Sequence, residues 1–301
     1  MELSDLRIFQ TVAQHGSVSR AARALNYVQS NVTARIQHME RKLGTPLFYR
    51  HSRGVTLNPE GRKLLSYAQK ILAMMDEMEK AFQDEENPSG PLLIGSVETV
   101  SGLPAILSAY CGRYPRVDLS LVTGVTEHLV NDVLAYELDG AFVSGPIEHP
   151  EIAQELLTEE ELVLIASGDG ASHTLDECKS RPLLVFRSGC GYRARLVQWL
   201  AAEGITPSRI MEFGTLETIL AMAASGLGVS LVPRAAVAHL EEAGRIRCHS
   251  IPHEFGRVST VFIRRRDAIL SSSMRKLLET IRQFRDEGGT GTSQPEAAAR
   301  S

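Results

Sequence analysis

The stretch from residue 17 to residue 43 constrains the fold of this chain most, because it has the pattern of two helices joined by a very short connector. In the first helix apolar residues recur at helical spacing, and two alanines leave room for close packing: Val18, Ala21, Ala22 and Leu25. In the second helix, steps of four, three and four predict one buried stripe: Val32, Ile36, Met39 and Leu43. Asn26 in the connector suits the left-handed conformation that ends a helix.

Polar and basic side chains occupy the remaining face of the second helix. They are Gln29, Ser30, Thr33, Gln37, His38 and Arg41, with Ala34 among them and Arg35 toward one edge. A short helix, a tight turn and a helix with hydrogen-bonding residues outward are typical of a helix-turn-helix, whose second helix can lie in a DNA major groove. An ordinary helical hairpin would have the same apolar spacing, so the flanking residues must decide between the two.

The flanks supply further blocks in order: L-x-x-F at 6–9, S-x-x-x-A-A-x-x-L at 17–25, Q-S-x-x-T-x-x-I-x-x-M-E at 29–40, L-G-x-x-L-F-x-R at 43–50, and then Thr56, Pro59 and Gly61. With these blocks the chain resembles the LysR-type transcriptional regulators, whose N-terminal domain is a winged helix-turn-helix. The sequence departs from the family at one position. The family often has Arg directly after the Ser or Thr of the recognition helix, whereas here Ala34 stands there and Arg35 follows.

Residues 1–58 are therefore expected to form a winged helix-turn-helix DNA-binding domain, beginning with a helix over 4–14 capped by Ser4 or Asp5. We expect Gln29, Ser30 and Thr33 at base edges, and Arg35, Arg50 and Arg53 at phosphates or in the minor groove. Solvated loop charge is the alternative for the last two, which lie in the predicted wing. The full set of candidate DNA contacts is Ser17, Gln29, Ser30, Thr33, Ala34, Arg35, Arg50 and Arg53.

The charge distribution agrees with this placement, although the formal net charge of −4 alone argues against nucleic-acid binding. Residues 1–62 hold nine Lys or Arg against four Asp or Glu, so positive charge gathers where DNA binding is predicted. The four cysteines show no spacing of a metal site or a disulfide framework. No apolar stretch has the length of a signal or a membrane span, so we expect a cytoplasmic protein with reduced thiols and no membrane contact.

A long linker helix followed by a hinge is predicted over residues 59–91, with Pro59 at the first helical position. Alternating steps of four and three give the period of a coiled-coil seam: Leu64, Ala68, Ile71, Met75, Met78 and Phe82. We expect this seam to pair two copies into a homodimer, and the resemblance adds a homotetramer built as a dimer of dimers. Packing of the helix against its own domain is the alternative.

From residue 92 short apolar runs alternate with helical segments, which predicts βαβ units and a largely parallel sheet. The first set has strands at 92–97, 119–122 and 140–143, and a second has strands near 183–186, 210–213 and 228–232; runs at 162–166 and 258–263 are expected to cross between two lobes. Residues 92–286 thus resemble the two-lobed, periplasmic-binding-protein-like effector domain of the family. The expected fold class is α/β throughout this part, and residues 287–301 are expected to be a disordered tail.

Ligands of such sheets bind beyond strand ends, where helices begin. Hydroxyls at these places are candidate effector contacts, although each can be only a helix cap: Thr99, Ser101, Thr126 and Thr215. Around a glycine turn, Arg187 and Arg193 together with the thiol of Cys190 and the phenol of Tyr192 could clamp a carboxylate or phosphate; the arginines could equally form structural ion pairs. Cys190 between them is a candidate contact and also a candidate redox switch, because basic neighbours favour thiolate; an unreactive thiol is the alternative.

The motifs of enzymes are missing: the sequence has no nucleophile elbow, phosphate-binding P-loop, H-E-x-x-H or paired catalytic carboxylates. We expect no enzyme activity, no cofactor and no metal. A transporter's solute-binding protein would account for the second half only. The sequence therefore predicts a transcriptional regulator that binds a two-fold operator in double-stranded DNA and responds to a small anionic effector between its lobes. RNA polymerase is a further candidate partner, and a thiol switch at Cys190 is the alternative mechanism.

Overall fold

The computed structural model describes residues 1–81, 86–168 and 174–287. The chain divides into two compact units, one of residues 1–83 with 135–137 and one of residues 84–134 with 138 onward. The linker helix thus groups with the N-terminal unit. Phe82, most of the predicted hinge's acidic start and the predicted tail after Glu287 lie outside the described residues. Within the described residues, every helix is too short or too polar to cross a membrane.

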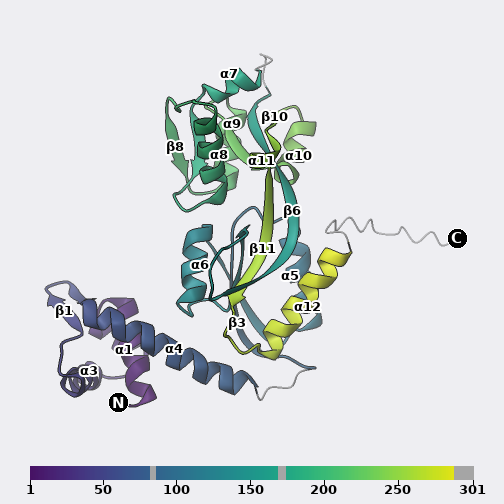
Figure 1. Ribbon diagram of the computed structural model, residues 1–301. Helices are drawn as coiled ribbons and strands as arrows, with labels where there is room; N and C mark the ends of the chain where they lie inside the picture. Colours follow the sequence, from purple (N-terminus) through teal and green to yellow (C-terminus); the bar gives the residue numbers. More distant parts are fainter. Residues whose placement is uncertain (82–85, 169–173, 288–301) are drawn as a thin grey trace. The chain divides into compact units, whose positions relative to one another are not determined.

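The N-terminal unit is a winged helix-turn-helix, as predicted (Figure 1). Its elements are α1 Leu3–His15, α2 Val18–Ala24, α3 Gln29–Leu43, β1 Phe48–His51, β2 Gly54–Leu57 and α4 Pro59–Ala81. The apolar faces of the helices form one core, in which the rings of Phe9 and Phe48 lie 5.3 Å apart. Val32, Ile36 and Met39 are buried as predicted. Leu43 is instead 43% exposed, because it is the last residue of α3 and the core has ended there.

Two tight turns set the geometry of this unit. Asn26 has φ 56°, the left-handed conformation expected between α2 and α3. In the wing, β1 and β2 pair antiparallel and turn at Gly54. Gly54 has φ 142°, and a β-carbon there would lie 2.2 Å from the carbonyl oxygen of Gly16, so the hairpin can approach the helices only with glycine at this position. The cap of α1 is Glu2, not the predicted Ser4 or Asp5; Glu2 and Asp5 form a reciprocal capping box.

The predicted seam of α4 is wrong in its first half. Leu64 and Ala68 pack into the core of their own unit together with Leu65 and Leu72. A different stripe faces solvent, again at steps of four, three and four: Tyr67, Ile71, Met74 and Met78. One face of the helix therefore packs into the core of its own unit, and a second apolar face stays exposed. The seam predicted from periodicity combined residues of both faces.

The C-terminal unit begins with a lobe built on three parallel strands. β3 Gly90–Ser96 lies between β4 Val117–Thr123 and β5 Gly140–Gly145, and the connections are α5 Leu103–Arg113 and α6 Thr126–Leu134. α12 Ser272–Asp286 packs beside α5 over the same core, to which it contributes Leu277 and Ile281. These strands and both connecting helices match the predicted βαβ units.

Two long strands continue from this lobe into the second one (Figure 1). They are β6 Ile152–Ser167 and β11 Arg257–Arg265, which pair antiparallel with each other, as expected for strands that cross between lobes. Their order in the sheet is β10-β6-β11-β5-β3-β4, with β9 also paired to β6. The prediction of a largely parallel sheet is wrong at this level, because every pairing made by β6 and β11 is antiparallel.

The second lobe surrounds a core that includes the fully buried Trp199. Its remaining elements are α7 Leu175–Lys179, β7 Leu183–Phe186, α8 Gly191–Ala202, β8 Ile210–Phe213, α9 Leu216–Ala224, β9 Ser230–Pro233, α10 Arg234–Glu242, β10 Ile246–Ser250 and α11 His253–Gly256. β7 and β8 form a separate parallel pair. Buried Lys179 lies 5.4 Å above the Trp199 ring and pairs with Glu203, which also accepts a hydrogen bond from the indole of Trp199.

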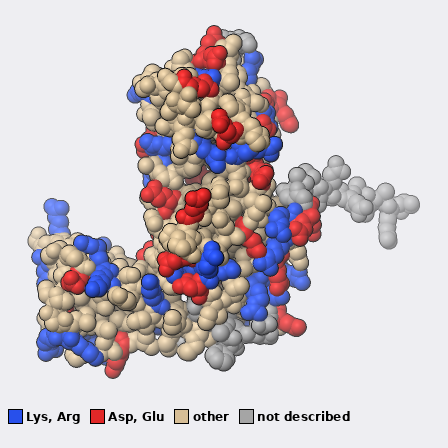
Figure 2. All heavy atoms as spheres, viewed as in Figure 1, with Lys and Arg blue, Asp and Glu red and all other residues tan. Residues whose placement is uncertain are grey.

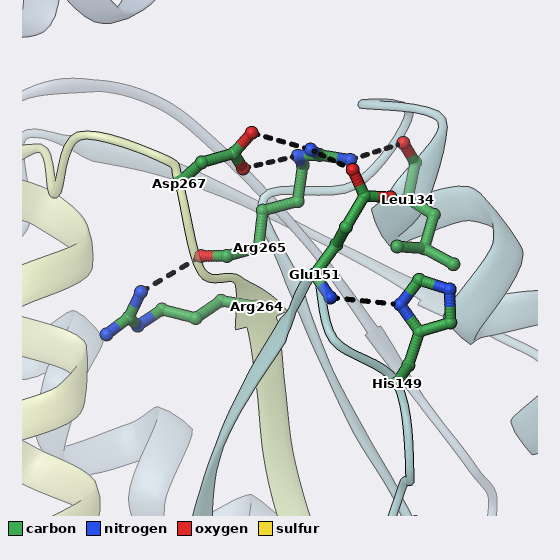
Figure 3. Close-up of polar contacts among 6 residues, drawn as sticks. All are labelled: Leu134, His149, Glu151, Arg264, Arg265 and Asp267. Atoms are coloured by element: carbon green, nitrogen blue, oxygen red, sulfur yellow. Dashed lines mark hydrogen bonds and ion pairs between the residues drawn. The ribbon is translucent and has the colours of Figure 1, made fainter.

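Arg265 fixes the end of β11 in the first lobe (Figure 3). Its buried guanidinium donates two hydrogen bonds to Asp267, at 2.8 and 2.7 Å, and a third to the backbone oxygen of Leu134 at 2.9 Å. Glu151 lies 3.6 Å away as a second acidic partner. Because the fork binds both a carboxylate and the last turn of α6, it ties the crossing strand to the helix behind it.

Candidate nucleic-acid interface and effector cavity

The solvent face of α3 presents the predicted base-reading residues. Gln29, Ser30, Ala34, Gln37 and His38 are all exposed. The first turn of α3 has no side-chain cap, so its backbone N–H groups also remain available to an acceptor. Figure 2 shows more Lys and Arg than Asp and Glu on the visible face of this unit.

Hydrogen bonds hold part of this face in place. The hydroxyl of Ser19 donates to Oε1 of Gln29 at 2.9 Å, which links α2 to the start of α3. Thr33 donates to the backbone oxygen of Gln29 at 2.9 Å, and Ser17 accepts from the N–H of Arg20 as the cap of α2. The side-chain NH₂ group of Gln29 stays exposed, whereas the hydroxyls of Thr33 and Ser17 already serve their own helices. Sequence reasoning missed Ser19, because nothing in the pattern shows which side chain reaches Gln29.

Arg35, one of the predicted phosphate contacts, has acidic partners within its own unit. Its guanidinium donates to Asp5 at 2.8 Å and lies 3.3 Å from Glu2, so it ties α3 to α1. Burial alone would raise the pKa of Asp5, but the backbone N–H of Glu2 and the Arg35 guanidinium lower that pKa overall. Arg35 is therefore assigned to the structure of the unit, and the buried carboxylate of Asp5 is the reason that the position needs a cation.

The two wing arginines differ in their surroundings. Arg50 on β1 lies 3.7 Å from Glu40, whose other oxygen accepts a hydrogen bond from the N–H of Leu47. Arg53 is exposed at the turn of the hairpin, and among the contacts of the described residues its guanidinium makes none. The guanidinium of Arg53 is therefore available for a DNA phosphate, whereas the charge of Arg50 is partly neutralised by Glu40.

A cavity of about 250 Å³ lies between the two lobes of the C-terminal unit. The loop after β3, the start of α6 and the end of β5 line it from the first lobe, and the end of β7 and the start of α8 from the second. Its polar side chains are Glu98, Thr99, Thr123, Thr126, His128, Ser144, Arg187 and Tyr192. Strand ends and helix starts thus meet here, as the topology predicts.

Three hydrogen bonds join the lobes around the cavity. Thr99 donates to the hydroxyl of Tyr192 at 2.8 Å, and the N–H of Leu216, the first residue of α9, donates to Oε2 of Glu98 at 2.7 Å. The N–H of Glu127 donates to the backbone oxygen of Gly189 at 3.3 Å. Burial raises the pKa of Tyr192 to about 12, so its hydroxyl keeps its proton at neutral pH and can donate to an acceptor in the cavity.

Four of the predicted effector residues line this cavity: Thr99, Thr126, Arg187 and Cys190. The other three do not line it. Ser101 donates to Glu160, a buried carboxylate on β6 that also accepts from Thr260 of β11. Ser101 thus secures the loop after β3 to the crossing strands.

Arg193 and Thr215 are likewise structural here. Arg193 pairs with Glu212 at 2.6 Å and donates to the backbone oxygen of Phe186. Thr215 is the N-cap of α9 and accepts from the N–H of Thr218. These outcomes match the alternatives of an ion pair and a helix cap, because Arg193 is paired with a residue of β8 and Thr215 is bonded to the helix that it begins.

Cys190 does not have the properties of a redox switch. It is the N-cap residue of α8, and burial raises the pKa of its thiol even though the backbone N–H groups of Arg193 and Tyr192 act in the opposite direction. The thiol form therefore predominates at neutral pH, which disfavours nucleophilic oxidation chemistry. Within the ranges that the structure describes, no three His, Cys, Asp or Glu side chains are grouped as a metal site.

Tyr192, the phenol of the predicted glycine-turn cluster, lines the cavity from the first turn of α8. The predicted contacts did not include Glu98, His128 or Ser144, although they line the cavity too. His128 and Ser144 come from α6 and β5. Glu98 stands next to the predicted Thr99, so loop position was an available signal for it. For the other two, only the tertiary fold shows that they face the same space.

A winged helix-turn-helix joined to a two-lobed unit with a cavity between its lobes defines a ligand-responsive transcription factor. Residues 3–62 match the family model of the bacterial regulatory helix-turn-helix protein, lysR family, and residues 85–286 match that of the LysR substrate binding domain. The chain belongs to the LysR family of transcriptional regulators. Members of this family bind DNA, and the protein is a regulator and not an enzyme.

Similar proteins support the same conclusion over nearly the full length. The HTH-type transcriptional regulator CzcR of Bacillus cereus is 57% identical over 283 residues, which cover 94% of this chain and 98% of that protein. The HTH-type transcriptional regulator GltR of Bacillus subtilis is 48% identical over 288 residues, covering 94% and 96%. The structure of full-length CbnR complexed with its target DNA has the same fold, with a TM-score of 0.64 and 24% identity over 94% of this chain and 99% of that one.

Proposed function

We propose that this regulator binds a small carboxylate in the inter-lobe cavity and that this effector changes its affinity for its operator. The observation that carries the proposal is Arg187, which lines the cavity and whose guanidinium makes no hydrogen bond or ion pair among the contacts of the described residues. An arginine fork suits a carboxylate; the hydroxyl of Tyr192 adds a donor on the same wall, and the start of α6 at Thr126 adds donors on the other wall. The volume suits a small metabolite.

On DNA, we infer that Gln29 and Ser30 read base edges in the major groove while Arg53, with Arg50, binds backbone phosphate or the minor groove. Ala34 has no hydrogen-bonding group and contacts a thymine methyl in this proposal. Two copies pair through the exposed stripe of α4 and bind a two-fold operator, with a dimer of dimers as the further assembly. In this proposal the regulator acts in the cytoplasm, and RNA polymerase is the partner that responds to the DNA-bound regulator.

In this proposal, effector binding is coupled to operator binding through the arrangement of the two lobes. Hydrogen bonds from Thr99 to Tyr192 and from Leu216 to Glu98 join the two walls of the cavity. An effector that binds both walls favours one arrangement of the lobes over others, and only such a difference can change operator binding. Coupling of this kind is typically about 1–3 kcal/mol, so operator affinity should change several-fold.

The test titrates the DNA upstream of the regulator's own gene with protein, with and without a panel of small carboxylates. Arg187→Gln should bind this DNA as the parent does and lose the response to the carboxylate. Arg209→Gln is the matched control, because Arg209 is an exposed arginine of the same lobe outside the cavity. Cys190→Ser should keep the response. Loss of the response in Cys190→Ser with retention in Arg187→Gln would overturn the proposal in favour of a thiol mechanism.

A further inference from the structure

The inter-lobe cavity holds one carboxylate and one guanidinium, which do not neutralise each other, beside the imidazole of His128. Glu98 approaches from the first lobe and Arg187 from the second, and no ion pair joins them among the contacts of the described residues. Both lie at the start of α9. Oε2 of Glu98 accepts from the N–H of Leu216, and a guanidinium nitrogen of Arg187 is 3.6 Å from where a β-carbon of Gly214 would lie.

Each of the two groups has binding capacity left. The described contacts of Glu98 use only Oε2, so Oε1 can accept a further hydrogen bond. Arg187 has all its donors available. A molecule that fills the cavity takes water away from both charges, and a charge that loses water without gaining a partner is strongly unfavourable. The occupant therefore has to bring a partner for each.

We propose that the effector is amphoteric: a small amino carboxylate, such as an α-amino acid, whose carboxylate binds Arg187 and whose ammonium group binds Oε1 of Glu98. This inference rests on the proposed function, that the cavity is the effector site. A plain dicarboxylate would place its second negative charge against Glu98, and a plain amine would leave Arg187 unpaired. Val97, Val125 and Phe186 in the same cavity supply an apolar wall for the rest of the molecule.

Glu98 also offers a variant that changes charge and little else. In Glu98→Gln the amide oxygen can still accept from the N–H of Leu216, so the link between the lobes is preserved while the negative charge is removed. Glu98 is exposed, so the change should not disturb folding. The single tryptophan, Trp199, lies in the core of the second lobe and reports the integrity of that core by fluorescence.

The experiment measures binding to the purified full-length protein by calorimetry, using each common L-amino acid beside the carboxylic acid that lacks its amino group, such as aspartate with succinate and leucine with 4-methylpentanoate. We expect at least one amino acid to bind at least tenfold more tightly than its deaminated partner. Glu98→Gln should reduce that preference to threefold or less, mainly by weakening the amino acid. Arg187→Gln should weaken both members of the pair at least tenfold.

The outcomes separate this inference from the proposed function. The amphoteric effector would be overturned if the parent protein bound each amino acid and its deaminated partner equally well. It would also be overturned if the preference for the amino acid survived in Glu98→Gln. Either outcome would leave the carboxylate site in place. Binding that is unchanged in Arg187→Gln would overturn the carboxylate site itself. If no amino acid binds but a simple carboxylate does, the inference is wrong and the proposed function stands; if neither series binds, both are wrong.

Discussion

Gln29 is the residue of α3 whose chemistry is most specific for a base, because a side-chain amide can pair with adenine through one donor and one acceptor. The Ser19 hydroxyl fixes its oxygen at 2.9 Å and leaves the amide exposed. We predict that Gln29→Ala weakens operator binding by about 1–3 kcal/mol and relaxes the preference at one base pair. Binding assays with operators substituted singly at each position measure both effects.

The matched control for this prediction is Arg53→Ala. A phosphate contact carries no sequence information, so this variant should weaken all operators alike and lower the slope of affinity against salt by about 1. If Gln29→Ala instead weakened every sequence to the same extent, its assignment to a base would be wrong.

Asp5 shows how one buried carboxylate links pH to stability in the N-terminal unit. Its pKa lies below the ordinary value near 4, so its contribution is present above about pH 4 and is lost as the pH falls through the lowered pKa. We predict that Asp5→Asn lowers the free energy of unfolding by about 1–3 kcal/mol at pH 7. The difference in free energy of unfolding between variant and parent should become smaller at pH 3. Urea denaturation monitored by circular dichroism measures this difference.

Glu2→Gln serves as the comparison, because Glu2 faces the same guanidinium but its side chain is 71% exposed. It should change stability little at either pH, since exposed ion pairs contribute little. An equal gap for Asp5→Asn at pH 7 and pH 3 would show that its charge is not the source of the effect.

At the scale of elements, α4 has two apolar faces, of which one is buried in its own unit and the other is exposed. Ala68 and Leu72 are buried in their own unit, whereas Ile71, Met74 and Met78 are 43–68% exposed at the spacing of a coiled-coil seam. We predict that Ile71→Glu with Met74→Glu leaves the unit folded and abolishes two-fold pairing, because like charges would meet across the seam. Analytical ultracentrifugation should then find the monomer.

Ser66→Glu is the control on the same helix, since it also adds negative charge at an exposed position, but one that lies about 100° around the helix from the stripe. It should sediment as the parent does. Should the double variant also keep the parent's mass, α4 would not be the interface.

At the scale of the whole molecule, each unit has its own hydrophobic core. Among the residues whose side chains the structure describes, the core of the N-terminal unit extends no further than Leu72, and the three cores of the C-terminal unit begin at Leu92. We therefore predict that the two units unfold independently. Asp5→Asn should lower the midpoint of the transition of the N-terminal unit while leaving the midpoint reported by Trp199 fluorescence unchanged.

A fragment of residues 86–287 provides the second measurement. It should fold alone, with the same Trp199 transition as the full chain, because all residues of its cores are retained. A Trp199 midpoint that moved with Asp5→Asn would show that the units unfold as one.

The sequence by itself determined the elements and their order. In the helix-turn-helix, local rules were sufficient: helical spacing gave the buried Val32, Ile36 and Met39, and Asn26 gave the left-handed turn. Six strands of the two lobes were found in the same way, namely β3, β4, β5, β7, β8 and β9, since periodicity and turn residues are properties of neighbouring positions. The strand β10 and the helices α10 and α12 were not among the predicted elements. The positions of Thr99, Thr126 and Arg187 at the cavity followed from one topological rule about strand ends.

Only the tertiary structure decided which polar groups are already satisfied. Arg35 and Arg193 have the residue type of an anion site, but Asp5 and Glu212 on other elements bind them. The same holds for Ser101 and buried Glu160, which are far apart in the chain. A sequence pattern cannot show whether a charged side chain already has a partner, because folding brings such partners together from distant parts of the chain. Folding likewise brings Glu98 and Arg187 to one cavity from different lobes, and their presence there is the basis of the proposed amphoteric effector.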